Sequence, residues 1–141
     1  MFEVEVRTLD GAPTGIGSAG PYTLIVDRPA DAGGAGLGFN GGQLLYLAVA
    51  GCVSNDLFRE AAAAGIALRR VRVAVHGDFT GDPAVSTAVD YDVEIDGEAL
   101  DERLRELVEH VDRIAEIPTS LRDGTDVRLA RTTVSRTDDP G

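Results

Sequence analysis

Cys52 carries the most nucleophilic type of side chain in the sequence, and it is the only cysteine among 141 residues. A single thiol excludes an intramolecular disulfide, a Cys-x-x-Cys redox motif and a zinc site built from several cysteines of one chain. The cysteine lies well inside a predicted helix, where the helix dipole does little to activate a thiol. Buried free cysteines usually act as small apolar residues, so the residues alone favour packing and leave a reactive thiol as the alternative.

The other candidate chemical groups do not form a recognisable site. His76 is predicted on the polar face of a strand and His110 on the polar side of a helix, each without a second metal ligand at a convincing spacing. Ser54 lacks the Gly-x-Ser-x-Gly turn of serine hydrolases. The runs of Asp and Glu are typical of a solvated surface. We therefore expect no metal and no cofactor.

A glycine-rich loop precedes the helix that contains Cys52. Its Gly36-x-Gly38-x-x-Gly41 pattern formally matches a dinucleotide fingerprint. The preceding strand ends near Arg28, too far back for a tight strand-turn-helix unit, and no second parallel strand is predicted. No lysine follows, so the loop is not a Walker loop. In a chain with 17 glycines, coincidence is the better interpretation.

Length and charge restrict the class of protein. The chain of 141 residues is predicted to be a single domain over 1–141, in which about 137–141 is a frayed tail. A formal net charge of -11 opposes binding to nucleic acid or to an anionic membrane surface. The first residues do not resemble a secretory signal, and the longest nearly apolar run, Leu44–Val53, is too short to span a bilayer. We expect a cytoplasmic location.

Hydrophobic periodicity predicts the order β-β-β-α-β-β-α-β and an α+β fold with antiparallel sheets. The first helix is apolar on nearly all faces, which predicts a central position against another helix or a second subunit. The strand pair after it should match an Arg-bearing face with an Asp/Glu-bearing face. The predicted elements are strands over 2–8 and 21–29 with a short irregular strand between them, a helix over 42–64, a hairpin over 67–97, a helix over 98–117, and a last strand over 125–136.

Several of these segments together resemble one known family. The stretch GGAGLGFNGGQLLYLAVAGC over 33–52, the stretch AAAAGI over 61–66 and the valine-rich hairpin after them resemble the OsmC/Ohr family of thiol-dependent hydroperoxide reductases. The similarity continues through the second helix and the segment AEIPTSLRDGTDVRL over 115–129. It therefore extends over nearly the whole chain.

The resemblance implies an intertwined homodimer, in which antiparallel sheets wrap two central helices and the active sites lie at the subunit interface. It places Cys52 at the position of the peroxidatic thiol. The family's other catalytic groups are replaced: Gly42 stands at the position of a helix-start Glu, Ile117 at that of the resolving cysteine, and the loop over 10–20 contains no Arg. Arg7 and Arg28 flank that loop, but nothing in their spacing selects one as a substitute.

Three functions remain open from the sequence, and the third is a purely structural or partner-binding dimer. The first is a one-cysteine thiol-dependent peroxidase that reduces organic hydroperoxides, with Cys52 as nucleophile and an external thiol as reductant. The second is a non-catalytic dimer that binds a small apolar ligand at the subunit interface, with Cys52 only lining the site. The charged groups within hydrogen-bond reach of the sulfur should separate them.

Overall fold

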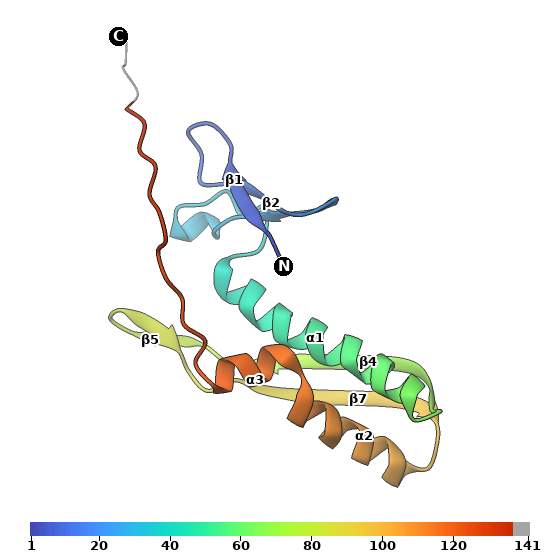
Figure 1. Ribbon diagram of the computed structural model, residues 1–141. Helices are drawn as coiled ribbons and strands as arrows, with labels where there is room; N and C mark the ends of the chain where they lie inside the picture. Colours follow the sequence, from blue (N-terminus) through green and yellow to red (C-terminus); the bar gives the residue numbers. More distant parts are fainter. Residues whose placement is uncertain (137–141) are drawn as a thin grey trace.

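The computed structural model describes residues 1–136, and their strands form three antiparallel sheets, of which one runs along the central helix and one lies beyond the start of that helix (Figure 1). The first sheet has the order β1-β2-β3, the second pairs β4 with β7, and a small third sheet pairs β5 with β6. The α+β class and the antiparallel pairing predicted from the sequence are confirmed. The strands are β1 (Glu5–Thr8), β2 (Gly15–Ala19), β3 (Tyr22–Val26), β4 (Ala67–His76), β5 (Phe79–Gly81), β6 (Ala84–Ser86) and β7 (Asp90–Glu98).

The two ends of the central helix α1 (Gly41–Ala63) are determined by residues that cap it. At its start, the Asn40 side chain accepts a hydrogen bond from the Gln43 amide at 2.9 Å, and the Gln43 side chain accepts one from the Asn40 amide at 3.0 Å. This reciprocal capping box satisfies two amides that the helix leaves without partners. At the other end, Gly65 adopts a positive φ of 70°, a conformation that favours glycine. The predicted helix over 42–64 is thus confirmed to within one residue.

The hydrophobic core lies between α1, α2 (Asp101–Ile114) and one face of the β4–β7 pair. Valines and isoleucines of the two strands, among them Val71, Val73 and Ile95, pack against it from the sheet side. Helix α2, which the sequence predicted over 98–117, supplies Leu107 and Val111 to this core. The buried members of the core are Val53, Leu57, Ala61, Ile66, Leu107, Val111 and Ala115.

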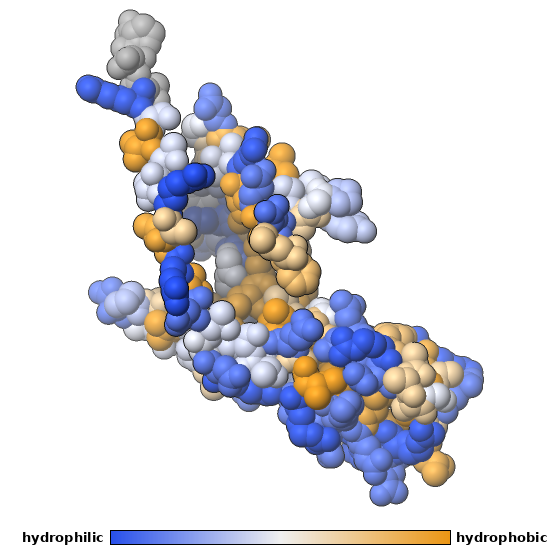
Figure 2. Space-filling view, viewed as in Figure 1, coloured by the Kyte–Doolittle hydropathy of each residue, from blue (hydrophilic) through white to orange (hydrophobic). Residues whose placement is uncertain are grey.

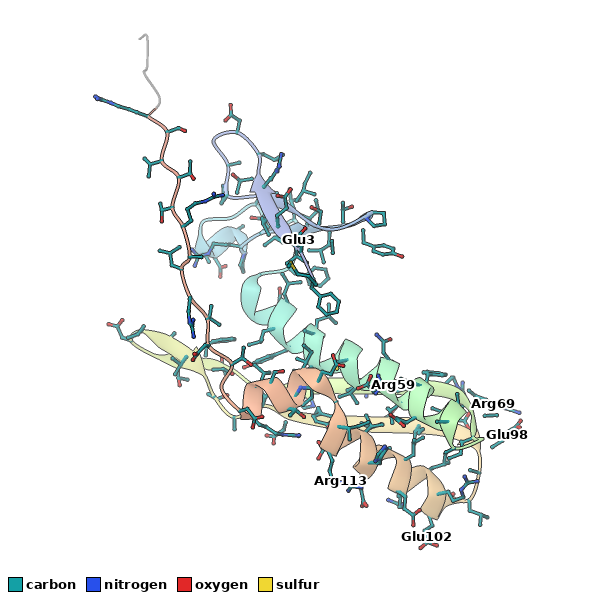
Figure 3. All side chains as sticks on the ribbon, in the orientation of Figure 1. Glu3, Arg59, Arg69, Glu98, Glu102 and Arg113 are labelled. Carbon is teal, nitrogen blue, oxygen red and sulfur yellow. The ribbon has the colours of Figure 1, made fainter. Side chains whose placement is uncertain are left out.

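The opposite face of the β4–β7 pair carries a row of ion pairs. Strand register places Arg70 beside Asp96 and Arg72 beside Glu94, with nitrogen–oxygen distances of 3.1 and 3.5 Å. Arg69 and Glu98 form a further pair at 3.1 Å at the end of the strands (Figure 3). The predicted pairing of an Arg face with an acidic face is confirmed. These side chains are exposed, so each pair contributes less than about 1 kcal/mol.

Two elements differ from the sequence predictions. Pro118 does not end the helical region: a short helix α3 (Glu116–Arg122) contains it near its start, where a proline needs no amide hydrogen. The segment 125–136 is not a strand in the single chain but an exposed, irregular segment leading away from α3 (Figure 1). A strand requires a neighbouring strand to bond with, and within residues 1–136 none pairs with this segment. The predicted frayed end, 137–141, lies outside the described residues.

Apolar side chains remain exposed on the elements at the two ends of the chain. Figure 2 shows hydrophobic side chains over the N-terminal sheet and along the C-terminal segment, whereas hydrophilic ones dominate over α2. None of the helices within residues 1–136 is long and apolar enough to cross a bilayer. The most exposed apolar side chains at these two ends are Met1, Phe2, Val4, Tyr22, Val127, Leu129 and Val134.

Candidate functional site

Cys52 lies in the middle of α1 and is partly buried against the hydrophobic core. Its nearest polar partner is Asp56, one helical turn further along, whose Oδ2 is 4.0 Å from the Cys52 sulfur. The Asp56 side chain is only 8% exposed, and its Oδ1 forms an ion pair with Arg59 at 3.0 Å. One face of α1 therefore carries a short chain of contacts from thiol to carboxylate to guanidinium.

This arrangement puts a negative group, not a positive one, next to the sulfur. A carboxylate accepts a hydrogen bond from a thiol, but it repels the negative charge of a thiolate. Arg59 offsets part of that repulsion through its ion pair with Asp56, although its own side chain is 56% exposed and well hydrated. Within residues 1–136, no hydrogen bond joins the Cys52 sulfur to an arginine or a histidine. Within one chain, the carboxylate orients the thiol without activating it.

Gly42, the residue at the position where the family resemblance implies a Glu, lies beside the stacked rings of Phe79 and Tyr46. A Cβ atom added at Gly42 would lie 2.7 Å from Cε2 of Phe79, so the aromatic ring occupies the space of a side chain there. Phe79 stacks on Tyr46 with ring centroids 5.6 Å apart. The Tyr46 hydroxyl donates to the backbone carbonyl of Asp78 at 3.1 Å, which ties the β5–β6 hairpin to the start of α1. The glycine at this position is thus required by local packing.

The other residues weighed as substitutes for catalytic groups do not reach Cys52 in the single chain. Arg7 pairs with Glu5 at 2.9 Å on the exposed strand β1. The Arg28 amide donates to Asp27 in the glycine-rich loop. Ile117 lies partly buried beside Pro118 in α3 and offers no thiol. None of these side chains forms a hydrogen bond with the Cys52 sulfur in the described part of the chain.

Asp27 explains the glycine-rich loop that resembled a nucleotide-binding motif. Its carboxylate is buried and accepts hydrogen bonds from the amides of Arg28, Ala35 and Leu37 and from the Thr14 hydroxyl. Burial acts to raise the pKa of Asp27, but these hydrogen bonds outweigh it and lower the pKa below its ordinary value. The loop amides that could bind a phosphate are already hydrogen-bonded to the Asp27 carboxylate. This geometry agrees with the interpretation that the glycine pattern matches a dinucleotide fingerprint by coincidence.

Both histidines are exposed and pair with single carboxylates. His76 lies 3.0 Å from Asp92 on the charged face of the β4–β7 pair. His110 lies 3.6 Å from Glu60, between α2 and α1. Within residues 1–136, no group of three or more His, Cys, Asp or Glu side chains is arranged to hold a metal ion. Neither histidine is therefore assigned a role in catalysis or metal binding.

One cavity of about 340 Å³ lies one turn before Cys52 on α1, and the sequence analysis did not identify it. It is formed where α1, the residues after β6 and α3 meet, three segments that are far apart in sequence. Val49, three residues before Cys52 on the same helix, lines the cavity, whereas Cys52 is not one of its lining residues. The apolar lining residues are Leu45, Val49, Val89, Pro118 and Leu121.

Two polar lining residues of the cavity, Tyr91 and Arg122, form hydrogen bonds to Asp112, which does not itself line the cavity. Tyr91 donates to the Asp112 carboxylate, and Arg122 donates to the same carboxylate at 2.7 Å. Burial, followed by the hydrogen bond and negative charge of Asp112, raises the pKa of Tyr91 to about 12. The hydrogen bonds from Tyr91 and Arg122 lower the pKa of Asp112 against the effect of burial. The Asp112 contact raises the pKa of Arg122, which stays charged.

Comparisons with known proteins give a consistent result. The family model described as OsmC-like protein matches residues 33–130. A search of curated proteins gives no significant match. Three similar solved structures are an OsmC-like protein from Mycoplasma pneumoniae, an organic hydroperoxide resistance protein OsmC from Legionella pneumophila and an organic hydroperoxide resistance protein from Elizabethkingia anophelis.

The three structures share the fold at low sequence identity. The identities are 15%, 18% and 17%, and the TM-scores are 0.75, 0.60 and 0.67, in the same order. They cover 89%, 86% and 88% of this chain and 89% of each of the other chains. At such identities the likeness establishes the architecture alone.

Proposed function

The chain belongs to the family of OsmC-like proteins, and from this premise we propose that it is a one-cysteine thiol-dependent peroxidase that reduces organic hydroperoxides. The observation that carries the proposal is the placement of the only thiol, Cys52, in the central helix of this fold, where it is partly accessible. The organic hydroperoxide resistance proteins among its structural neighbours support the substrate class.

The proposed reaction needs one thiol from the protein and two from an external reductant. The Cys52 thiolate attacks one oxygen of the hydroperoxide, the O–O bond breaks, and the leaving alkoxide takes a proton to become an alcohol. Cys52 is then a sulfenic acid. A first external thiol condenses with it and releases water, and a second thiol displaces Cys52 and leaves an external disulfide. A second cysteine in the chain is therefore not required.

We propose that the working form is a homodimer, and that the chain functions as a single domain in the cytoplasm. Exposed apolar side chains on the N-terminal sheet and on segment 125–136 support the homodimer, because a soluble protein rarely leaves such surfaces uncovered. Exposed apolar and small residues of α1, such as Leu47 and Phe58, support a second helix packed against it. A dimer would also bring further side chains to Cys52.

Steady-state turnover tests the proposed activity. Cumene hydroperoxide should be consumed by the protein in the presence of dithiothreitol, and the Cys52→Ser variant should lose this activity. A useful control is Ser54→Ala, which changes a neighbouring helical residue without touching the thiol. Equal consumption by wild type and Cys52→Ser would contradict the proposal.

The cavity favours a second candidate function, the binding of a small apolar ligand. Its apolar lining by Leu45, Val49 and Leu121 does not require a reactive thiol. A ligand-binding protein of this kind should retain its affinity in Cys52→Ser and show no hydroperoxide turnover. Comparing the two measurements on the same variant separates the two functions.

A further inference from the structure

The cavity between α1 and α3 combines an apolar body with a single cationic group. Five of its lining residues are apolar, and they come from α1, from the strand region at Val89 and from α3. The remaining lining residues are three hydroxyl-bearing residues and Arg122. No carboxylate lines it in the described part of the chain. The ligand that matches such a lining is apolar over most of its length and negative at one end.

The hydroxyl groups of this cavity already have partners within the protein. The Ser86 hydroxyl lies 2.8 Å from the Tyr46 hydroxyl and 2.9 Å from the Thr87 carbonyl, and both are within hydrogen-bond distance. Thr87 donates to the carbonyl of Ala88 at 3.1 Å, and Tyr91 donates to Asp112. A ligand therefore gains little by hydrogen bonding to these hydroxyls, because each would have to give up an existing bond.

The Arg122 guanidinium has N–H donors that are not used by its contacts with Asp112. Its Nη1 donates to the Asp112 carbonyl at 2.8 Å and its Nη2 to the Asp112 carboxylate at 2.7 Å. A guanidinium has five N–H donors in a fixed plane, so these two contacts hold it in place and leave others for a ligand. Asp112 itself does not line the cavity, and a ligand in the cavity meets the guanidinium instead of the carboxylate.

We propose that this cavity binds a small carboxylate with an apolar chain, such as a medium-chain fatty acid. Its chain lies against Leu45, Val49 and Leu121, and its carboxylate accepts hydrogen bonds from Arg122. The volume of about 340 Å³ is at the lower end of the range for small-molecule sites, which restricts the ligand to a short or medium chain. This proposal deepens the second candidate function and is independent of thiol chemistry at Cys52.

Isothermal titration with decanoate and 1-decanol tests the proposal on the full chain. Decanoate should bind wild type, and Arg122→Gln should weaken its affinity tenfold or more, because a charge-assisted hydrogen bond is lost. The affinity for 1-decanol should change less than about twofold in the same variant. Arg105→Gln is the matched control: it removes the same charge from α2 without touching this cavity and should leave both affinities unchanged.

Arg122→Gln could weaken binding by destabilising the fold, because Arg122 also forms hydrogen bonds to Asp112. A second variant therefore tests the cavity without changing Arg122. Leu121→Trp fills the cavity from the partly exposed end of α3 and should abolish binding of both probes while keeping the circular dichroism spectrum. Binding of both probes with no effect of Arg122→Gln would overturn the role of Arg122 and retain an apolar site. Failure of wild type to bind either probe would overturn the site and the second candidate function together.

Discussion

Replacing Asp56 by asparagine is expected to make Cys52 react faster with a hydroperoxide. The Asp56 carboxylate is the charged group next to the sulfur, 4.0 Å away, and it is almost fully buried. Asparagine keeps the size and polarity of the side chain but removes the negative charge. Negative charge that develops at the sulfur during the proposed reaction is then not opposed by a neighbouring carboxylate.

The size of the effect follows from the distance. Two unit charges about 4 Å apart repel by about 1 kcal/mol in water and about 4 kcal/mol at an effective dielectric constant of about 20. The ion pair between Asp56 and Arg59, at 3.0 Å, cancels part of this repulsion, so the lower figure applies. A change of about 1 kcal/mol corresponds to roughly a fivefold faster reaction, because about 1.4 kcal/mol is a factor of ten.

Stopped-flow or quenched-flow measurement of the second-order rate with cumene hydroperoxide provides the assay, with iodoacetamide as a probe that needs no peroxide site. Glu60→Gln is the matched control, since Glu60 also contacts Arg59 but forms no contact with the sulfur. It should change either rate less than twofold. An unchanged or slower reaction of a folded Asp56→Asn variant would show that the carboxylate does not slow the reaction of Cys52, and our reasoning about this site would be wrong.

Three further predictions concern the elements that position the site. Gly38→Ala should destabilise the fold by about 1–3 kcal/mol in urea unfolding, because its Cβ would overlap the backbone carbonyl of Ile25, whereas Gly41→Ala, with open space around it, should not. The lowered pKa of Asp27 predicts stability that is fully present above its ordinary value of 3.8 and is lost as pH falls through the lower folded value; Asp27→Asn should flatten this acid dependence, and an unchanged unfolding profile would contradict it. The raised pKa of Tyr91 predicts stability that is present below pH 10 and is lost as pH rises towards about 12; in a spectroscopic titration Tyr91→Phe should remove the ionisation near pH 12, and its persistence would contradict the prediction.

The sequence predicted those helices and strands that are determined by residues close together in the chain. The alternating valines of β4 and β7, the capping residues of α1 and the apolar stripe of α2 each determine structure within a few residues, and the fold class and the paired charges followed from them. The strand predicted over 125–136 is absent because a strand needs a neighbouring strand to bond with, and within residues 1–136 none pairs with this segment. The continuation of helix past Pro118 was missed because a proline is tolerated near a helix start.

The site was predictable only in part. The position of Cys52 on the central helix followed from the sequence, but its contact with Asp56 is a spacing of four residues that many helical pairs share. The cavity joins Val49, Val89 and Leu121 from segments far apart in the chain, so no local pattern indicates it. The Tyr91, Asp112 and Arg122 group has the same origin. A carboxylate and an arginine ten residues apart on two helices give no signal without the fold.

The most direct test of the proposed function is a single turnover at Cys52. The reduced protein is mixed with one equivalent of cumene hydroperoxide in the presence of dimedone, which traps sulfenic acids, and is analysed by intact-mass and peptide mass spectrometry. We expect one dimedone adduct per chain, located at Cys52, together with an equal amount of cumyl alcohol. Complete recovery of unmodified Cys52 and intact hydroperoxide, from a protein that is folded and dimeric, would contradict the assignment of Cys52 as the peroxidatic thiol.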